Sequence, residues 1–139
     1  MKAVGYFVFL SVAIVTGRPN RKILVIPEEF VPPVIKASAD CADKFGLETI
    51  DILAKYFSGG LEDSDSVRKY MYCLGTTTGY IDGNANIVKG KIAKVVGEHK
   101  EKVGSVVDEC NKSKFNDKYE KVFHVVQCFR ENSGIMLKV

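Results

Sequence analysis

Apolar residues recur at helical spacing along most of the chain downstream of Pro33. In the first such segment Phe30, Val34, Ala37 and Cys41 follow one another at steps of four, three and four residues, which places them on one face of a helix. Later segments repeat this periodicity and are bounded by glycines, turn residues or polar residues suited to cap a helix. The pattern predicts about six short helices, over residues 30–45, 49–57, 64–74, 88–96, 99–110 and 119–126.

Local signals mark where several of these helices begin and end. Thr49 is a candidate cap for the second helix, Gly59-Gly60 would end it, and Asp63 or Ser64 would cap the third. Strand-like alternation is hardly seen outside Lys22–Ile26. We therefore expect an all-α fold. Because isolated helices of about 10–15 residues are marginal in water, packing and crosslinks must stabilise them.

The N-terminus has the pattern of a secretory signal peptide. Met1-Lys2 precede an uncharged apolar run from Ala3 to Val15, and Thr16-Gly17 follow as small residues at the expected cleavage site. The run is shorter than the ~20 residues that a membrane-spanning helix needs. A buried N-terminal helix is the alternative, but no capping residue precedes it. We interpret residues 1–17 as a signal peptide and residues 18–139 as a single helical domain.

Charge and cysteine content narrow the function classes. The formal net charge is +3, and removal of Lys2 with the signal peptide would leave +2, which is too weak to indicate nucleic-acid binding. Cys41, Cys73, Cys110 and Cys128 are separated by 31, 36 and 17 residues, so no paired-cysteine zinc site is indicated. In a secreted chain, this spacing favours two disulfides that join helices. The spacing alone leaves three pairings open.

The sequence contains no evident catalytic or metal-binding motif. His99 and His124 raise the alternative of a ribonuclease-like acid–base pair, but no nuclease motif surrounds either residue. A milder hypothesis assigns His124 to ligand release in acid. Asp63 and Asp65 lack the ligand spacing of a calcium loop. We therefore expect no enzymatic activity, no metal and no cofactor. Asn111-Lys112-Ser113 is a formal glycosylation sequon.

Three features together carry a family resemblance: the cysteine spacing, the segment Cys41–Gly46 and the turn Tyr80–Asn86 before the fourth helix. With the signal peptide, the mature length and the six helices, the chain resembles the insect odorant-binding proteins of the pheromone-binding and general-odorant-binding family. The resemblance implies the bridges Cys41–Cys73 and Cys110–Cys128, the pairing that we favour, around a central apolar cavity. By the loop-closure model each bridge would stabilise the fold by roughly 3–4 kcal/mol.

The resemblance also points to a subgroup. Common members of this family have six cysteines, and the chain carries Lys69 and Tyr119 at the positions that match the second and the fifth. It therefore resembles the Minus-C subgroup, which lacks the bridge between those two positions. The missing bridge would leave the cavity less rigid.

The resemblance implies that the inward faces of several helices line the cavity. We expect a volume of at least ~300 Å³, the low end for small-molecule sites. A hydroxyl of Tyr70 or of residues 76–78 would bind a ligand oxygen. The apolar C-terminal segment would act as a lid, with packing in an outer groove as the alternative. The candidate ligand-binding residues are Tyr70, Met71, Leu74, Val88, Ile92, Val107, Val122, Phe123, Val126, Ile135, Met136 and Leu137.

The sequence thus predicts a secreted carrier of small hydrophobic molecules such as odorants or pheromones, in sensillum lymph or another extracellular fluid. We expect a monomer or weak homodimer, with a membrane receptor as a further candidate partner and no nucleic acid. The alternatives are a membrane-interacting or structural helical protein of the saposin type and, less favoured, the ribonuclease-like enzyme. Saposin-type proteins usually place cysteines near both chain ends, which this spacing does not resemble.

Overall fold

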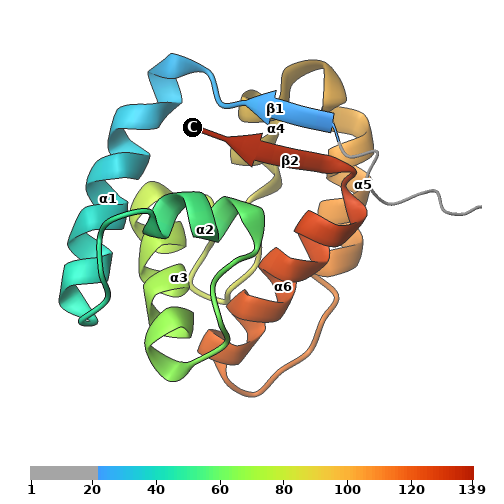
Figure 1. The fold of residues 1–139 in the computed structure, drawn as a ribbon. Helices are drawn as coiled ribbons and strands as arrows, with labels where there is room; N and C mark the ends of the chain where they lie inside the picture. The colour runs from blue at the N-terminus through green and yellow to red at the C-terminus, as the bar shows by residue number, and fades with distance from the viewer. Residues whose placement is uncertain (1–21) are drawn as a thin grey trace, which may run out of the picture.

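The computed structural model describes residues 22–139, so the expected signal peptide, residues 1–17, lies outside the described part. A helix forms in each of the six predicted segments, which confirms the all-α prediction (Figure 1). The elements are β1 (Lys22–Val25), η2 (Glu28–Phe30), α1 (Val31–Lys44), α2 (Ile52–Ser58), α3 (Asp65–Thr78), α4 (Lys89–Val96), η3 (Gly97–His99), α5 (Lys100–Cys110), α6 (Lys118–Asn132) and β2 (Ile135–Lys138), where η marks a single 3₁₀ turn.

The start of α3 follows the sequence prediction and the start of α2 does not. The Ser64 side-chain oxygen accepts a hydrogen bond from the Val67 backbone N–H at 3.1 Å, as expected of a helix cap. Thr49 does not cap α2, which begins three residues later, at Ile52. The reason lies at Asp51, whose φ of 61° turns the chain just before the helix.

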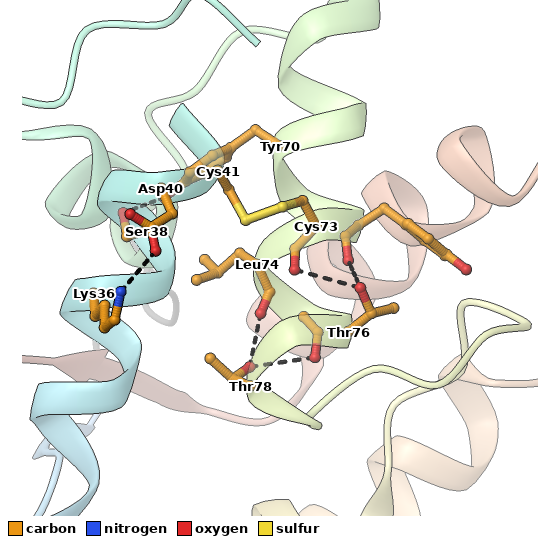
Figure 2. The surroundings of a disulfide bond; sticks show 11 residues. Lys36, Ser38, Asp40, Cys41, Tyr70, Cys73, Leu74, Thr76 and Thr78 are labelled. Carbon is orange, nitrogen blue, oxygen red and sulfur yellow. Dashed lines mark hydrogen bonds and ion pairs between the residues drawn. A yellow bond between two sulfur atoms is a disulfide. The ribbon is translucent and has the colours of Figure 1, made fainter. Parts of the chain in front are cut away.

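The two disulfides join helices that lie side by side. Cys41–Cys73 connects α1 to α3 with a Cα–Cα distance of 5.8 Å (Figure 2). Cys110–Cys128 connects α5 to α6 with a Cα–Cα distance of 5.7 Å. The favoured pairing is therefore confirmed. The bridges brace the packing of α1 on α3 and of α5 on α6, and α3 packs against α6 without a bridge.

The interior between these helices contains large side chains that are fully buried. Tyr70, Val103, Val107, Val122 and Val125 are each at most 1% exposed, and we call these five residues the bundle core. The Tyr70 hydroxyl lies 2.7 Å from the Ser38 hydroxyl oxygen, a hydrogen bond that provides its polar end with a partner inside the protein.

The two ends of the described chain pair with each other as a short parallel sheet. Lys22 is opposite Ile135 and Val25 is opposite Lys138, and the pair, which we call the strap, crosses one end of the helix bundle (Figure 1). Ile135 and Ile26, the residue after β1, are buried, whereas Ile23 is 62% exposed on the outer face. The strand-like alternation noted at Lys22–Ile26 coincides with β1. The pairing with β2 was not predicted.

Candidate ligand-binding cavity

A cavity of about 100 Å³ lies where α3, α4 and α6 meet α2 and the strap. Its lining is almost wholly apolar, which is typical of sites for lipophilic molecules. The lining residues are Ile26, Val34, Tyr56, Phe57, Leu74, Gly75, Thr78, Tyr80, Ile81, Ile87, Ile92, Val95, Val126, Phe129, Arg130, Ile135 and Leu137.

The cavity is smaller than the ~300 Å³ expected from the sequence. An apolar cavity of ~150 Å³ is enough to hold a benzene molecule. A ligand larger than this must displace side chains of the wall or the strap. On the scale of ~24 cal/mol per Å³, a cavity of this volume reduces the stability of the fold by about 2 kcal/mol. The reduction is smaller than for the expected ~300 Å³.

The structure separates the twelve candidate residues into three groups. Five of them line the cavity: Leu74, Ile92, Val126, Ile135 and Leu137. Met71 and Phe123 instead line a second hollow of about 120 Å³ beside Gly59 and Leu61, which we call the side pocket.

The other five candidates line neither hollow. Tyr70, Val107 and Val122 belong to the bundle core, Val88 is the residue before α4, and Met136 alternates with the cavity-lining Ile135 and Leu137 along β2. Helical periodicity identified the buried faces of α1, α3 and α5. It did not do so for α2, where Ile52 is buried and Ile50, just before the helix, is 75% exposed. Periodicity does not reveal whether the neighbouring elements pack tightly against a buried helix face or leave a cavity beside it.

A loop that the sequence analysis did not place at the site forms one wall. Ile81 and Ile87 both line the cavity and face each other as an antiparallel bridge. The Asn111 side chain fixes this loop, because its Oδ1 accepts from the Ile87 N–H at 2.8 Å and its Nδ2 donates to the Ile87 carbonyl at 3.0 Å. The sequon nitrogen thus forms a hydrogen bond in the folded protein.

Gly75 lets this loop close on α3. A Cβ atom at Gly75 would overlap the side chain of Ile81, so any larger residue would push the loop away from the helix. This close approach is a requirement that periodicity in the sequence does not reveal.

The hydroxyl groups that the sequence singled out have partners within the protein. The Thr78 hydroxyl donates to the Leu74 carbonyl at 2.8 Å, and the Thr76 hydroxyl donates to the Tyr72 carbonyl at 2.8 Å (Figure 2). The Tyr70 hydroxyl shares a hydrogen bond with the Ser38 hydroxyl, in which either oxygen can donate. These hydroxyls are therefore less suited to hold a ligand oxygen than the prediction assumed.

Tyr56 and Arg130, which sequence reasoning missed, bring polar groups to the cavity wall. Burial raises the pKa of Tyr56 to about 12, although the nearby Arg130 charge acts in the opposite direction. Arg130 Nη2 donates to the Tyr56 backbone carbonyl at 2.9 Å and so links α6 to α2. The Tyr56 ring meets the Tyr70 ring edge-on at a centroid distance of 6.3 Å.

The two histidines have separate surroundings. His124 stacks on Phe115 with ring centroids 4.8 Å apart and lines neither hollow, whereas His99 is half-buried with Nε2 3.7 Å from a Glu98 carboxylate oxygen. Within residues 22–139, no cluster of three or more metal-binding side chains occurs. The same residues form no helix that is long and apolar enough to cross a membrane.

Comparison with known families identifies the fold. The sequence profile of the PBP/GOBP family matches residues 26–132, a span that contains α1 to α6 and both disulfides. The chain belongs to this family. No protein with a curated description matches the chain. The family resemblance drawn from the cysteine spacing is therefore confirmed.

PBP/GOBP membership gives meaning to a surface contact between α3 and α6. Lys69 and Tyr119, the positions matched to the missing cysteines, lie next to each other, with Lys69 Nζ 5.8 Å from the Tyr119 ring centroid. Tyr119 also meets the Tyr72 ring edge-on at 5.3 Å, and Lys118 Nζ lies 4.7 Å from the Tyr72 centroid. A cation–π cluster thus joins the two helices.

Proposed function

We propose that this PBP/GOBP protein is a carrier that binds small hydrophobic molecules in the cavity beneath the strap and transports them. The observation that supports this most is the apolar cavity within the fold of a family of ligand-binding proteins. Odorants, pheromones and related lipophiles are the ligand classes that we expect. Members of the family are binding proteins and not enzymes, and the proposed mechanism includes no chemical step.

We further propose secretion through the signal peptide of residues 1–17 and assign the chain to the Minus-C subgroup on its four cysteines. Family members are secreted, and the two disulfides fit an extracellular protein. A monomer or weak homodimer in an extracellular fluid such as sensillum lymph would deliver its ligand to a membrane receptor.

The strap is the proposed lid. Ile135 and Leu137 contribute side chains to the cavity wall, while hydrogen bonds to β1 hold their strand in place. The Ile26 N–H donates to the Lys138 carbonyl at 2.8 Å and closes the far end of the sheet. Because the sheet is short, separating the two strands breaks few hydrogen bonds and would open this wall to a ligand.

A competition assay with an environment-sensitive apolar fluorophore tests the carrier function. Delipidated protein of residues 18–139 should take up the fluorophore saturably at micromolar concentration and release it to some odorants, pheromone esters or fatty acids. Ile92→Phe would fill the cavity and should reduce uptake, whereas the same change at the exposed Ile35 should not. No uptake by protein with both disulfides intact would contradict the proposal.

One observation keeps the membrane-interacting alternative in view. Ile23 and Val25 are 62% and 63% exposed on the outer face of the strap, where lipid could contact them. Co-sedimentation with liposomes separates the two functions. A carrier stays in the supernatant and leaves the vesicles intact. A membrane-directed protein sediments with the vesicles, and Ile23→Ser together with Val25→Ser would release it.

A further inference from the structure

The cavity and the side pocket share one wall. Arg130 lines both hollows, and no other described residue lines both. Its Nη2 donates at 2.9 Å to the backbone carbonyl of Tyr56, a residue of the cavity wall. A Cβ atom added at Gly59, a residue of the side pocket, would lie only 3.1 Å from Arg130 Nη1. The guanidinium group therefore lies between the two hollows.

The two hollows follow one another along the same pair of helices. α3 and α6 pack together and run in the same direction toward the strap (Figure 1). Met71 and Phe123 line the side pocket, and Leu74 and Val126, each three residues later, line the cavity. At a rise of ~1.5 Å per residue, this offset is about 4.5 Å along both helices. An extended chain that continues beyond the cavity along α3 and α6 therefore reaches the side pocket once it passes Arg130.

Enlarging the cavity at Arg130 requires only a side chain to move. Elsewhere the wall consists of the Ile87 loop, which Asn111 holds through two hydrogen bonds, and of α3 and α6, which disulfides tie to neighbouring helices. Displacing those walls moves backbone, whereas the half-buried Arg130 side chain can rotate toward solvent. The rotation breaks the bond to the Tyr56 carbonyl and the other interactions of Arg130, and water then solvates the guanidinium.

We propose that Arg130 is a movable partition that selects ligands by chain length. A ligand with a long unbranched hydrocarbon chain displaces Arg130 and extends into the side pocket, where Leu61, Met71 and Phe123 provide apolar side chains. The cavity of about 100 Å³ and the side pocket of about 120 Å³ then act as one site. A short-chain ligand leaves the partition closed. This inference rests on the proposed carrier function and adds the class of ligand.

Two ketones that differ only in chain length test the partition: methyl propyl ketone and methyl nonyl ketone. Fluorophore displacement gives the Kd of each, and the ratio of the two values within one variant cancels any loss of folded protein. Leu61→Trp would fill the side pocket and should raise the Kd of the nonyl ketone relative to the propyl ketone by about tenfold or more. The reason is that roughly two methylene groups lose their site, each equivalent to about a fourfold change in Kd. Leu47→Trp is the matched control, because Leu47 is also half-buried but lines neither hollow.

Removal of the partition should change the same ratio in the opposite direction. In Arg130→Ala the two hollows are joined and no side chain has to be displaced, so the nonyl ketone should bind more tightly relative to the propyl ketone. A purely structural role of Arg130 would weaken the binding of both ketones equally and leave the ratio unchanged.

A direct readout needs no variant. Intermolecular nuclear Overhauser effects to the methyl group of Met71 report whether a ligand enters the side pocket of the wild-type protein. The chain end of methyl nonyl ketone should contact this methyl group, and methyl propyl ketone should not.

The outcomes separate this inference from the carrier function. If both ketones bind but neither Leu61→Trp nor Arg130→Ala changes the ratio of their Kd values, the partition is wrong and the carrier function stands. Absence of contact between the nonyl ketone and Met71 would overturn it in the same way. If the fluorophore binds and neither ketone displaces it, the proposed ligand class is wrong. If the fluorophore itself does not bind, both proposals fail.

Discussion

The bundle core and the cavity are built from the same helical pattern of apolar residues but differ in what faces them. Val107 on α5 and Val122 on α6 are completely buried and line neither of the two hollows. Leu74 and Val126 lie on α3 and α6 as well, yet they face a loop, the short helices α2 and α4, and the strap, and they line a cavity. The same kind of apolar stripe thus supplies fully buried residues at some positions and cavity-lining residues at others.

Both disulfides join helices that contribute to the bundle core, so their removal should have the largest effect on stability. Replacing Cys41 and Cys73 by serine should lower the free energy of unfolding by roughly 3–4 kcal/mol, which urea denaturation would measure. The matching pair Cys110→Ser and Cys128→Ser should cost slightly less, because its loop is shorter. Unchanged stability in both variants would contradict the role of the bridges.

A new disulfide at the positions of the cation–π contact should increase the stability of the bundle. Lys69→Cys with Tyr119→Cys should form a third disulfide between α3 and α6 and stabilise the fold by roughly 2–4 kcal/mol. Thiol titration would show no free cysteine, and the Tm would rise. Two titratable thiols after oxidation would show that these positions do not correspond to the missing family cysteines.

Truncation of a valine in the bundle core should mainly affect stability, and truncation of a valine at the cavity should mainly affect ligand affinity. Val107→Ala leaves a hole in the bundle core and should cost roughly 1.5–3 kcal/mol of stability, with ligand affinity unchanged. Val126→Ala enlarges an existing cavity and should cost less stability but change the affinity for short-chain ligands. Urea denaturation and fluorophore displacement on both variants decide the matter. Equal effects of the two changes would remove the distinction between the regions.

Adjacent residues of β2 provide the smallest and most local comparison. Leu137→Ala should weaken ligand binding a few-fold and speed ligand release, because Leu137 lines the cavity. Met136→Ala, the neighbouring residue, should leave both unchanged. Deletion of residues 135–139 should exceed the effect of Leu137→Ala. Stopped-flow release rates would measure all three, and identical rates would contradict the lid.

The two regions also differ in how much of their structure could be predicted from the sequence. The helices, their caps such as Ser64, and the family could be predicted, because they depend on local spacing and on four cysteines. The pairing of β1 with β2 could not, because it joins opposite ends of the described chain. Tyr56 was missed for a related reason. Its place in the cavity wall depends on elements far apart in the sequence, which enclose the cavity together.

The position of the bound ligand tests the central claim most directly. Intermolecular nuclear Overhauser effects between methyl pentyl ketone and methyl-labelled protein would report which side chains touch it. The account predicts contacts to Ile87, Ile92 and Leu137 and none to Val103 or Val107. Contacts to the bundle core, or only to the exposed Ile23 and Val25 on the outer face of the strap, would contradict it.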